Sequence, residues 1–232
     1  MYFVNWQRIV SVEEWDGQKV VVKRNKPTKE FHEFLIVYAY SLISLLLAQP
    51  SSPPAISEIM TNEGYGMRNA LHKIGIPTPK LISISDEDLV EEYIEGGDLY
   101  LALASGQTSR AFEAGRLTGR MHKAGYSFVD NKAQNYLVRK SLVIRTDLGF
   151  IVKSNSLYAR GMDVGSFLAS VMDLESYEKI QARFYQGYLS EFESRFSYVS
   201  IVIRNLLSLG FSSNSKATFK NMLIDFSGLI DI

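Results

Sequence analysis

Two neighbouring stretches of the sequence decide the fold: MHKAGYSFVDNKAQNYLV at residues 121–138 and IRTDLGF at residues 144–150. The first reads as the end of a helix followed by a loop, because Gly125 is a natural helix stop. A short hairpin separates this loop from an Asp-Leu-Gly turn. The loop and the turn contain four polar residues: Asp130, Lys132, Asn135 and Asp147.

The same order resembles the protein-kinase-like superfamily, in which an Asp, an Asn and a second Asp surround one phosphate. The resemblance implies that Asp130 accepts or orients the proton of the substrate hydroxyl. It implies that Lys132 neutralises charge on the γ-phosphate of ATP, as in protein Ser/Thr kinases. Asn135 and Asp147 would ligate Mg²⁺, and Asp147 would bridge the metal to the phosphates.

The chain also departs from the usual kinase pattern close to these residues. Phe128 and Val129 stand where His and Arg usually precede the catalytic Asp, which fits a kinase that no phosphorylated activation loop controls. The short interval between Asp147 and Asp163 contains no Ala-Pro-Glu motif, as in RIO-type and aminoglycoside kinases. Asp163 resembles the helix Asp that braces the catalytic loop, although a helix N-terminus favours a carboxylate in any case.

The composition excludes several other classes of protein. Lys plus Arg and Asp plus Glu both number 25 in 232 residues, so the net charge of zero argues against a generally basic nucleic-acid binder. There is no Cys, which excludes thiolate chemistry and Cys-ligated zinc, and three scattered His make a His-based metal site unexpected. The N-terminus lacks a signal-peptide pattern, so we expect a cytoplasmic protein.

Two strands are expected at residues 2–14 and 18–24, joined by a turn at Asp16-Gly17. The second strand ends in Lys23 after an apolar run. Taken alone, this Lys reads as the solvated end of a strand. The motifs downstream favour the strand Lys that grips the phosphates of ATP.

The phosphate-covering loop of kinases has no counterpart in this sequence. No G-x-G-x-x-G and no P-loop occurs, and the expected place holds Asn5, Trp6, Gln7 and Arg8. Bulky side chains there limit the approach of backbone amides to phosphate. Two interpretations remain open: ATP binds more loosely, or Arg8 takes the place of the glycine-rich loop.

An uncharged apolar run at residues 34–48 predicts a helix with no counterpart in the kinase pattern. It is short for a membrane span, which needs about 20 residues, and His32, Glu33 and Pro50 flank it. We expect it to pack on the small lobe or to form a contact with a partner or a second copy.

A further helix is expected at residues 56–74, with its middle weakened by glycines. This helix would supply the carboxylate that pairs with Lys23. Glu63 is the first choice, and Glu58 is the alternative. A shift of one residue along this helix would turn the side chain by about 100°.

Two strands, at residues 80–85 and 89–94, follow Gly75-Ile76-Pro77-Thr78-Pro79 and lead into Glu92-Tyr93-Ile94-Glu95-Gly96. This succession resembles the end of the small lobe and the hinge of RIO-type and other small archaeal protein kinases. The resemblance implies that backbone groups of Glu92 and Ile94 bind the adenine edge. Glu91 stands near the position that gates the back of that pocket, where a carboxylate is unusual.

Helices dominate the rest of the chain. They are expected at residues 98–104, 108–124, 162–172, 176–196, 198–209 and 216–230, with two short strands at 136–139 and 142–146. Strands first and helices later indicate an α+β fold. The resemblance implies a bilobal, kinase-like domain with a nucleotide-binding lobe at residues 1–95 and a mostly helical catalytic lobe at 96–232.

Three hypotheses for the function follow. The first is an atypical protein Ser/Thr kinase that uses ATP and Mg²⁺, with an unknown protein substrate. The second is a phosphotransferase for small molecules such as aminoglycosides or sugars, whose catalytic loop usually lacks a Lys at the position of Lys132. The third is a pseudokinase that acts as a binding or regulatory module, favoured by the missing glycine loop.

Overall fold

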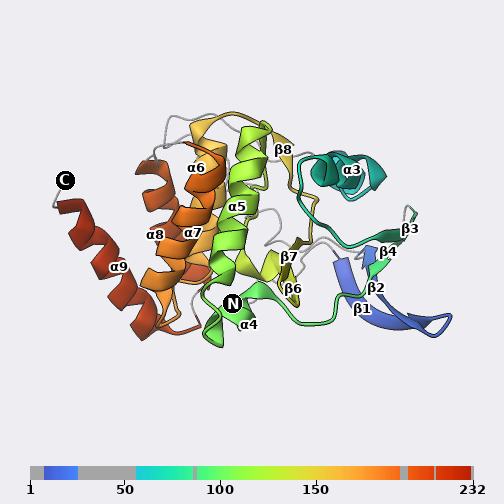
Figure 1. Cartoon of the computed structure of the whole chain (residues 1–232), viewed down its shortest axis with the longest axis horizontal. Coiled ribbons are helices and arrows are strands. Elements are labelled where there is room, and N and C mark those ends of the chain that lie inside the picture. The colour runs from blue at the N-terminus through green and yellow to red at the C-terminus, as the bar shows by residue number, and fades with distance from the viewer. Residues whose placement is uncertain (1–7, 26–55, 86–87, 194–197, 212, 231–232) are drawn as a thin grey trace.

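The computed structural model of the chain describes residues 8–25, 56–85, 88–193, 198–211 and 213–230. A four-stranded sheet and two short helices lie at one end, and a group of longer helices lies at the other. The hairpin of β6 (Tyr136–Arg139) and β7 (Leu142–Arg145) lies between them (Figure 1). The structure is thus α+β, with an antiparallel sheet in the N-terminal part and helices later, as expected. A lobe boundary between residues 95 and 96 stays a prediction.

The sheet has the order β1-β2-β4-β3, and all its strands are antiparallel. β1 (Arg8–Trp15) and β2 (Gln18–Asn25) form a hairpin in which Asp16 and Gly17 have φ angles of 50° and 75°. Both central residues of a tight hairpin turn of this kind need positive φ, which confirms the predicted turn. β4 (Asp88–Glu92) lies between β2 and β3 (Leu81–Ile84).

The helix expected at residues 56–74 is wrong as one continuous element. It is divided into α2 (Ile56–Asn62) and α3 (Tyr65–Lys73), because Gly64 adopts an extended conformation with φ −77° and ψ −179°. The break leaves Glu63 between the two helices, buried, where it contacts Arg68 of α3. The apolar run at residues 34–48 lies outside the described residues, so its expected partner contact stays a prediction.

The helical part is built on a close crossing of two helices, α5 (Arg110–Lys123) and α7 (Tyr177–Glu191). A Cβ atom at Gly115 would collide with the carbonyl oxygen of Phe184, and one at Gly187 would collide with that of Phe112. The two glycines therefore let the helix backbones approach each other. The main apolar core surrounds this crossing and extends to β6 and β7.

The remaining elements complete this core and its flanks. They are α4 (Leu99–Ala104), β5 (Tyr126–Ser127), the 3₁₀ turn η1 (Ala133–Asn135), β6 (Tyr136–Arg139), β7 (Leu142–Arg145), β8 (Val152–Lys153), α6 (Leu157–Ala169), α8 (Tyr198–Phe211) and α9 (Ser215–Ile230). α6 starts earlier than expected because the Ser156 side chain accepts a hydrogen bond from the N–H of Ala159 and caps the helix. α7 ends earlier than expected because Phe192 is extended.

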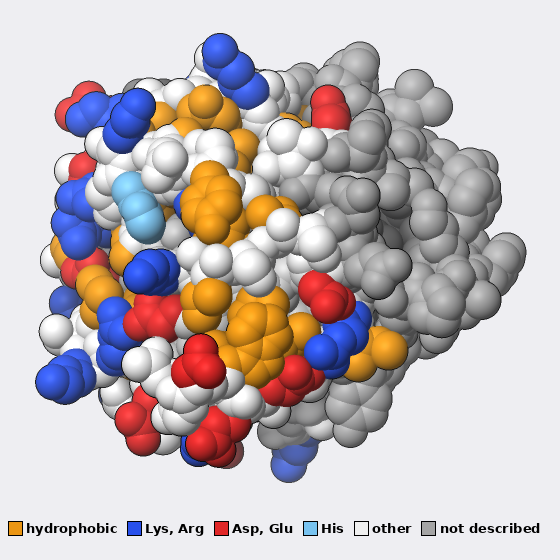
Figure 2. Space-filling model, turned by 90° about the vertical axis from the view of Figure 1, so that its right-hand side faces the viewer, with side chains coloured by type: hydrophobic (Ala, Val, Ile, Leu, Met, Phe, Trp, Pro, Cys, Tyr) orange, Lys and Arg blue, Asp and Glu red, His pale blue; other side chains and the backbone are white. Residues whose placement is uncertain are grey.

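The described surface at the sheet end has no single sign of charge. Figure 2 shows acidic and basic side chains interspersed with hydrophobic ones across the coloured atoms of this face. Among the described residues, none of the helices combines the length and the apolar character that crossing a membrane requires.

Candidate active site

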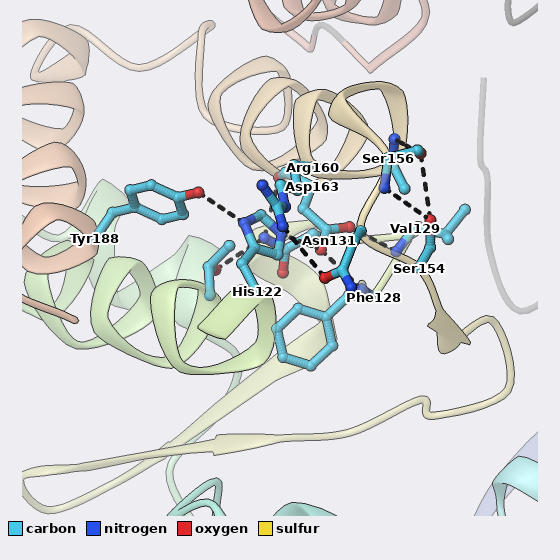
Figure 3. Close-up of polar contacts among 12 residues, drawn as sticks. His122, Phe128, Val129, Asn131, Ser154, Ser156, Arg160, Asp163 and Tyr188 are labelled. Atoms are coloured by element: carbon cyan, nitrogen blue, oxygen red, sulfur yellow. Dashed lines mark hydrogen bonds and ion pairs between the residues drawn. The ribbon is translucent and has the colours of Figure 1, made fainter. Parts of the chain in front are cut away.

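The loop between α5 and η1 is held from below by one buried carboxylate, Asp163 of α6. Its Oδ2 accepts a hydrogen bond from the N–H of Phe128 at 2.8 Å, and its Oδ1 accepts one from the N–H of Val129 at 2.6 Å. Nε2 of His122 lies 2.9 Å from the same carboxylate, and Tyr188 contacts the other ring nitrogen (Figure 3). These contacts hold Val129 at a φ of 65°, a conformation that costs energy for a β-branched residue.

The loop brings three of the four predicted residues into direct contact. The ammonium of Lys132 lies 3.0 Å from Oδ2 of Asp130. The amide nitrogen of Asn135 donates to the backbone carbonyl of Asp130 at 2.8 Å and to its Oδ2 at 3.1 Å. The Asp130 carboxylate thus has a positive charge and an amide beside it, and these contacts hold it in one orientation.

Asp147 follows β7 and is connected to this loop through the backbone. The N–H of Thr146 donates to the carbonyl of Asn135 at 2.9 Å, and Asp147 itself has a φ of 55°. One guanidinium nitrogen of Arg145 donates to the carbonyls of both Asp130 and Asp147. The loop and the Asp-Leu-Gly turn are therefore neighbours in space.

Lys23 of β2 belongs to a buried group of four charges. Its ammonium lies 2.8 Å from Oε1 of Glu91, and Oε2 of Glu91 lies 2.8 Å from a guanidinium nitrogen of Arg68. The same nitrogen of Arg68 lies 3.4 Å from Glu63. Two cations thus balance two carboxylates beneath the sheet, which is what burial of charge requires.

The pKa values of this group show the balance. Burial alone would lower the pKa of Lys23, but the charges of Glu91, Glu63 and Asp147 outweigh it and raise that pKa above its ordinary value. Burial would raise the pKa of Glu91, but the charges of Lys23 and Arg68 outweigh it and lower that pKa. The effect of Asp147 on Lys23 connects the sheet to the Asp-Leu-Gly turn electrostatically.

Glu63, the expected partner of Lys23, lies in this group. Its Oε1 accepts a hydrogen bond from the N–H of Leu148 at 3.1 Å, so it links the end of α2 to the Asp-Leu-Gly turn. Glu58, the alternative, is exposed on α2. The roles of Glu91 and Arg68 were missed in the sequence. An Arg three residues before the buried Leu71, on the same helical face, is the signal that could have indicated a buried charge.

The predicted adenine-binding segment leaves the sheet after β4. Ile94 is buried, and the carboxylate of Glu92 lies 2.5 Å from a guanidinium nitrogen of Arg139 on β6. The other oxygen of that carboxylate accepts from the N–H of Lys80. The Glu92 side chain thus ties the hinge to the β6–β7 hairpin. Asn5, Trp6 and Gln7 lie outside the described residues, and Arg8 begins β1.

The chain is similar in sequence to archaeal proteins. No family model matches the chain. It is 28% identical over 124 residues to a probable serine/threonine-protein kinase BUD32 homolog of Archaeoglobus fulgidus, a match that covers 53% of the chain and 62% of that protein. It is 29% identical over 121 residues to a probable bifunctional tRNA threonylcarbamoyladenosine biosynthesis protein of Methanoculleus marisnigri, covering 52% of the chain and 22% of that protein. The chain therefore spans under two thirds of the length of these relatives.

A solved structure has a fold similar to that of this chain. The structure described as WaaP in complex with acyl carrier protein matches with a TM-score of 0.53 at 17% identity, covering 82% of this chain and 77% of that one. The chain is similar in sequence to a probable kinase and has a kinase-like fold, which supports the resemblance to the protein-kinase-like superfamily. Its fold is bilobal and kinase-like. The roles of Asp130, Asn135 and Asp147 as loop acid and metal ligands stay predictions.

The donor set of this kinase-like site fits Mg²⁺. Among the described residues, no group of three or more His, Cys, Asp or Glu is placed to hold a metal ion by itself. The amide oxygen of Asn135 and the carboxylate of Asp147 are hard donors, and Mg²⁺ is usually held by one or two carboxylates together with substrate phosphates and water. The residues therefore fit a metal that arrives with a nucleotide.

Proposed function

We propose that this chain is an atypical kinase that uses ATP and Mg²⁺ to phosphorylate a Ser or Thr hydroxyl of a protein. The observation that supports it best is the contact of Asp130 with both Lys132 and Asn135. A base, a cation and a metal-ligating amide around one point are what phosphoryl transfer requires, because the reaction depends on positioning and on neutralising charge.

In this proposal each residue has one task. Lys23 binds the phosphates, and the backbone at Glu92 and Ile94 binds adenine. Asp130 orients the acceptor hydroxyl and takes its proton while the hydroxyl oxygen bonds to the γ-phosphorus and the bond to the ADP oxygen breaks. Lys132 neutralises charge on the phosphoryl group in transit. Asn135 and Asp147 would hold Mg²⁺, which would neutralise the phosphates when bound.

Two features support a protein acceptor over a small molecule. Lys132 lies beside Asp130, and the catalytic loop of small-molecule phosphotransferases usually lacks that Lys. The archaeal relatives include a probable serine/threonine-protein kinase. Proteins of tRNA threonylcarbamoyladenosine biosynthesis, named in other relatives, are therefore sensible acceptors to test. Location in the cytoplasm stays a prediction.

A pseudokinase that acts as a binding or regulatory module is the second candidate. One observation favours it: the sequence has no glycine-rich loop to cover the phosphates of ATP.

The test is incubation with γ-labelled ATP and Mg²⁺, alone and with a general protein acceptor, a panel of sugars and aminoglycosides, or the tRNA-modification proteins. The variants are Asp130→Ala and Asp147→Ala, with Glu113→Gln as a control on the solvent side of α5. Transfer to protein by the wild type and the control, lost in both Asp variants, is the expected result. Transfer of the label to small molecules and not to protein would show that the acceptor is a small molecule. A nucleotide-induced thermal shift without transfer would favour the binding module. If the wild type shows neither transfer nor a thermal shift, the kinase proposal is refuted.

A further inference from the structure

Arg145, at the end of β7, is fully buried although it has a charged side chain. Its guanidinium carbon lies 4.4 Å from the ring centre of Phe128 and 5.0 Å from that of Tyr136. Stacking on two aromatic rings suits the flat, delocalised guanidinium and would not suit the ammonium of a Lys in the same way. In the described part of the chain no carboxylate forms an ion pair with this guanidinium. Its burial therefore needs a specific reason, because desolvation of an ion is costly.

The hydrogen bonds of Arg145 indicate that reason. Its Nη2 donates to the carbonyl of Asp130 at 2.9 Å and to the carbonyl of Asp147 at 3.2 Å. Its backbone N–H donates to the carbonyl of Pro77 at 2.9 Å, which anchors the end of β7. One nitrogen atom thus joins the backbones of the two acids on which the proposed reaction depends.

Both joined segments contain a residue in the left-handed region. Val129, directly before Asp130, has a φ of 65°, and Asp147 has a φ of 55°. Such conformations are unfavourable for residues other than glycine and persist only where surrounding contacts hold them. The bonds from Arg145 to the two carbonyls are contacts of this kind.

The position before Asp130 explains why another residue has to provide these contacts. Val129 stands there, and an apolar side chain offers neither a charge nor a donor to the Asp-Leu-Gly turn. Arg145, at the end of β7, reaches the carbonyls of both the loop and the Asp-Leu-Gly turn. Its Nη1 also lies 3.5 Å from Oδ1 of Asn131. Asn131 in turn accepts from the hydroxyl of Tyr136, whose pKa is raised to about 12 by burial.

We propose that Arg145 is a positioning residue that sets the separation of Asp130 and Asp147 and holds the loop and the turn in the geometry that phosphoryl transfer needs. The proposal rests on the proposed function for its catalytic meaning, but the positioning itself can be measured without any activity. Arg145 touches neither nucleotide nor acceptor in this scheme, so it acts only through the two acids.

The first experiment measures hydrogen exchange of the full chain without nucleotide. The variants are Arg145→Lys, which keeps the charge, and Arg145→Gln, which keeps donors without it. The matched control is Arg204→Lys, because Arg204 is also a buried Arg, and its Nε lies 2.7 Å from Asp225 of α9.

We expect the amides of residues 128–135 and 146–151 to exchange about tenfold faster or more in Arg145→Lys, as the loss of a hydrogen bond from a charged group predicts. Arg204→Lys should speed exchange in α7 to α9 and leave those two segments unchanged. Unchanged exchange in both segments of folded Arg145→Lys and Arg145→Gln would overturn the positioning role, whether or not the chain is a kinase.

The second experiment uses steady-state kinetics with ATP, below the unfolding temperature of each variant. Arg145→Lys should lower kcat about a hundredfold while the KM for ATP changes less than about threefold, because small displacements of reacting groups affect the chemical step most. Arg204→Lys should lower Tm and leave both constants unchanged. A wild type without transfer refutes the proposed function and leaves the exchange result to decide on Arg145, whereas an active wild type with an unchanged kcat in Arg145→Lys refutes the inference alone.

Discussion

Lys23 and Glu91 are diagonal neighbours on the paired strands β2 and β4, and their charged groups lie 2.8 Å apart. In the register of this pair Val21 faces Glu91 and Lys23 faces Leu89, so all four side chains point to the same face of the sheet. The partner of Lys23 is therefore contributed by the sheet that carries the Lys. The 2.8 Å contact that orients the ammonium is thus made within the sheet.

Removal of the Glu91 carboxylate should destabilise the protein and weaken nucleotide binding together. In Glu91→Ala, Lys23 and Arg68 would remain buried with less negative charge near them, and the free energy of unfolding should fall by about 3 kcal/mol. The affinity for ATP, measured by calorimetry, should fall about tenfold because Lys23 loses its fixed orientation. Glu113→Gln, which breaks a partly exposed pair with Arg116, should change stability by less than about 0.5 kcal/mol. Equal effects of the two substitutions would contradict the role of Glu91.

The free energy of unfolding should depend on pH through the same pair, Lys23 and Glu91. The pKa of Glu91 is lower in the folded chain than its ordinary value of 4.5, so the unfolded chain binds a proton more readily. The stabilisation from Glu91 is therefore complete above about pH 4.5 and is lost as the pH falls through the lower, folded pKa. Urea unfolding of the wild type and of Glu91→Gln across this range should give curves that converge towards acid. A constant difference between them at all pH values would argue against the depressed pKa.

Binding of Mg²⁺ together with nucleotide should depend on Asp147. In Asp147→Asn the carboxylate is replaced by a weaker neutral ligand, so the Mg²⁺ concentration needed for half-maximal nucleotide-induced thermal shift should rise tenfold or more, on the order of 1.4 kcal/mol. The thermal shift with nucleotide alone should stay the same, since the amide keeps the shape of the side chain. If Mg²⁺ has the same effect on the variant and the wild type, Asp147 is not a metal ligand.

The helix crossing at Gly187 makes a prediction about stability alone. Gly187→Ala would press a methyl group against the carbonyl of Phe112 and should lower the free energy of unfolding by about 2 kcal/mol or more. Gly66→Ala in α3 is the matched control, because a Cβ there meets nothing within 4 Å and its backbone has ordinary φ. That control should raise stability by about 0.5 kcal/mol, since it reduces the freedom of the unfolded chain. Thermal unfolding of both variants measures the contrast, and a stable Gly187→Ala would show that α5 and α7 can separate.

Much of the candidate site follows from residues that are close in the sequence. Asp130, Lys132 and Asn135 meet because a loop of this length, closed by a 3₁₀ turn, leaves few ways for the side chains to point. The turn at Asp16-Gly17 is equally local, and so are the two strands at 136–139 and 142–145. The catalytic roles of Asp130, Lys132 and Asn135 stay predictions. So do the nucleotide-binding roles of Glu63, Glu92 and Ile94.

The sequence by itself determined the order of the elements, the hairpin turn and the motif around Asp130, because short-range backbone geometry decides each of them. Only the tertiary structure decided that Lys23 pairs with Glu91, that Arg68 balances Glu63, and that Arg145 joins the two acids. These contacts connect residues from separate elements, so they depend on strand register, on the break at Gly64 and on which charges are buried together. Charge that leaves water has to find a partner, and which partner is near is a property of the folded chain and not of its local sequence.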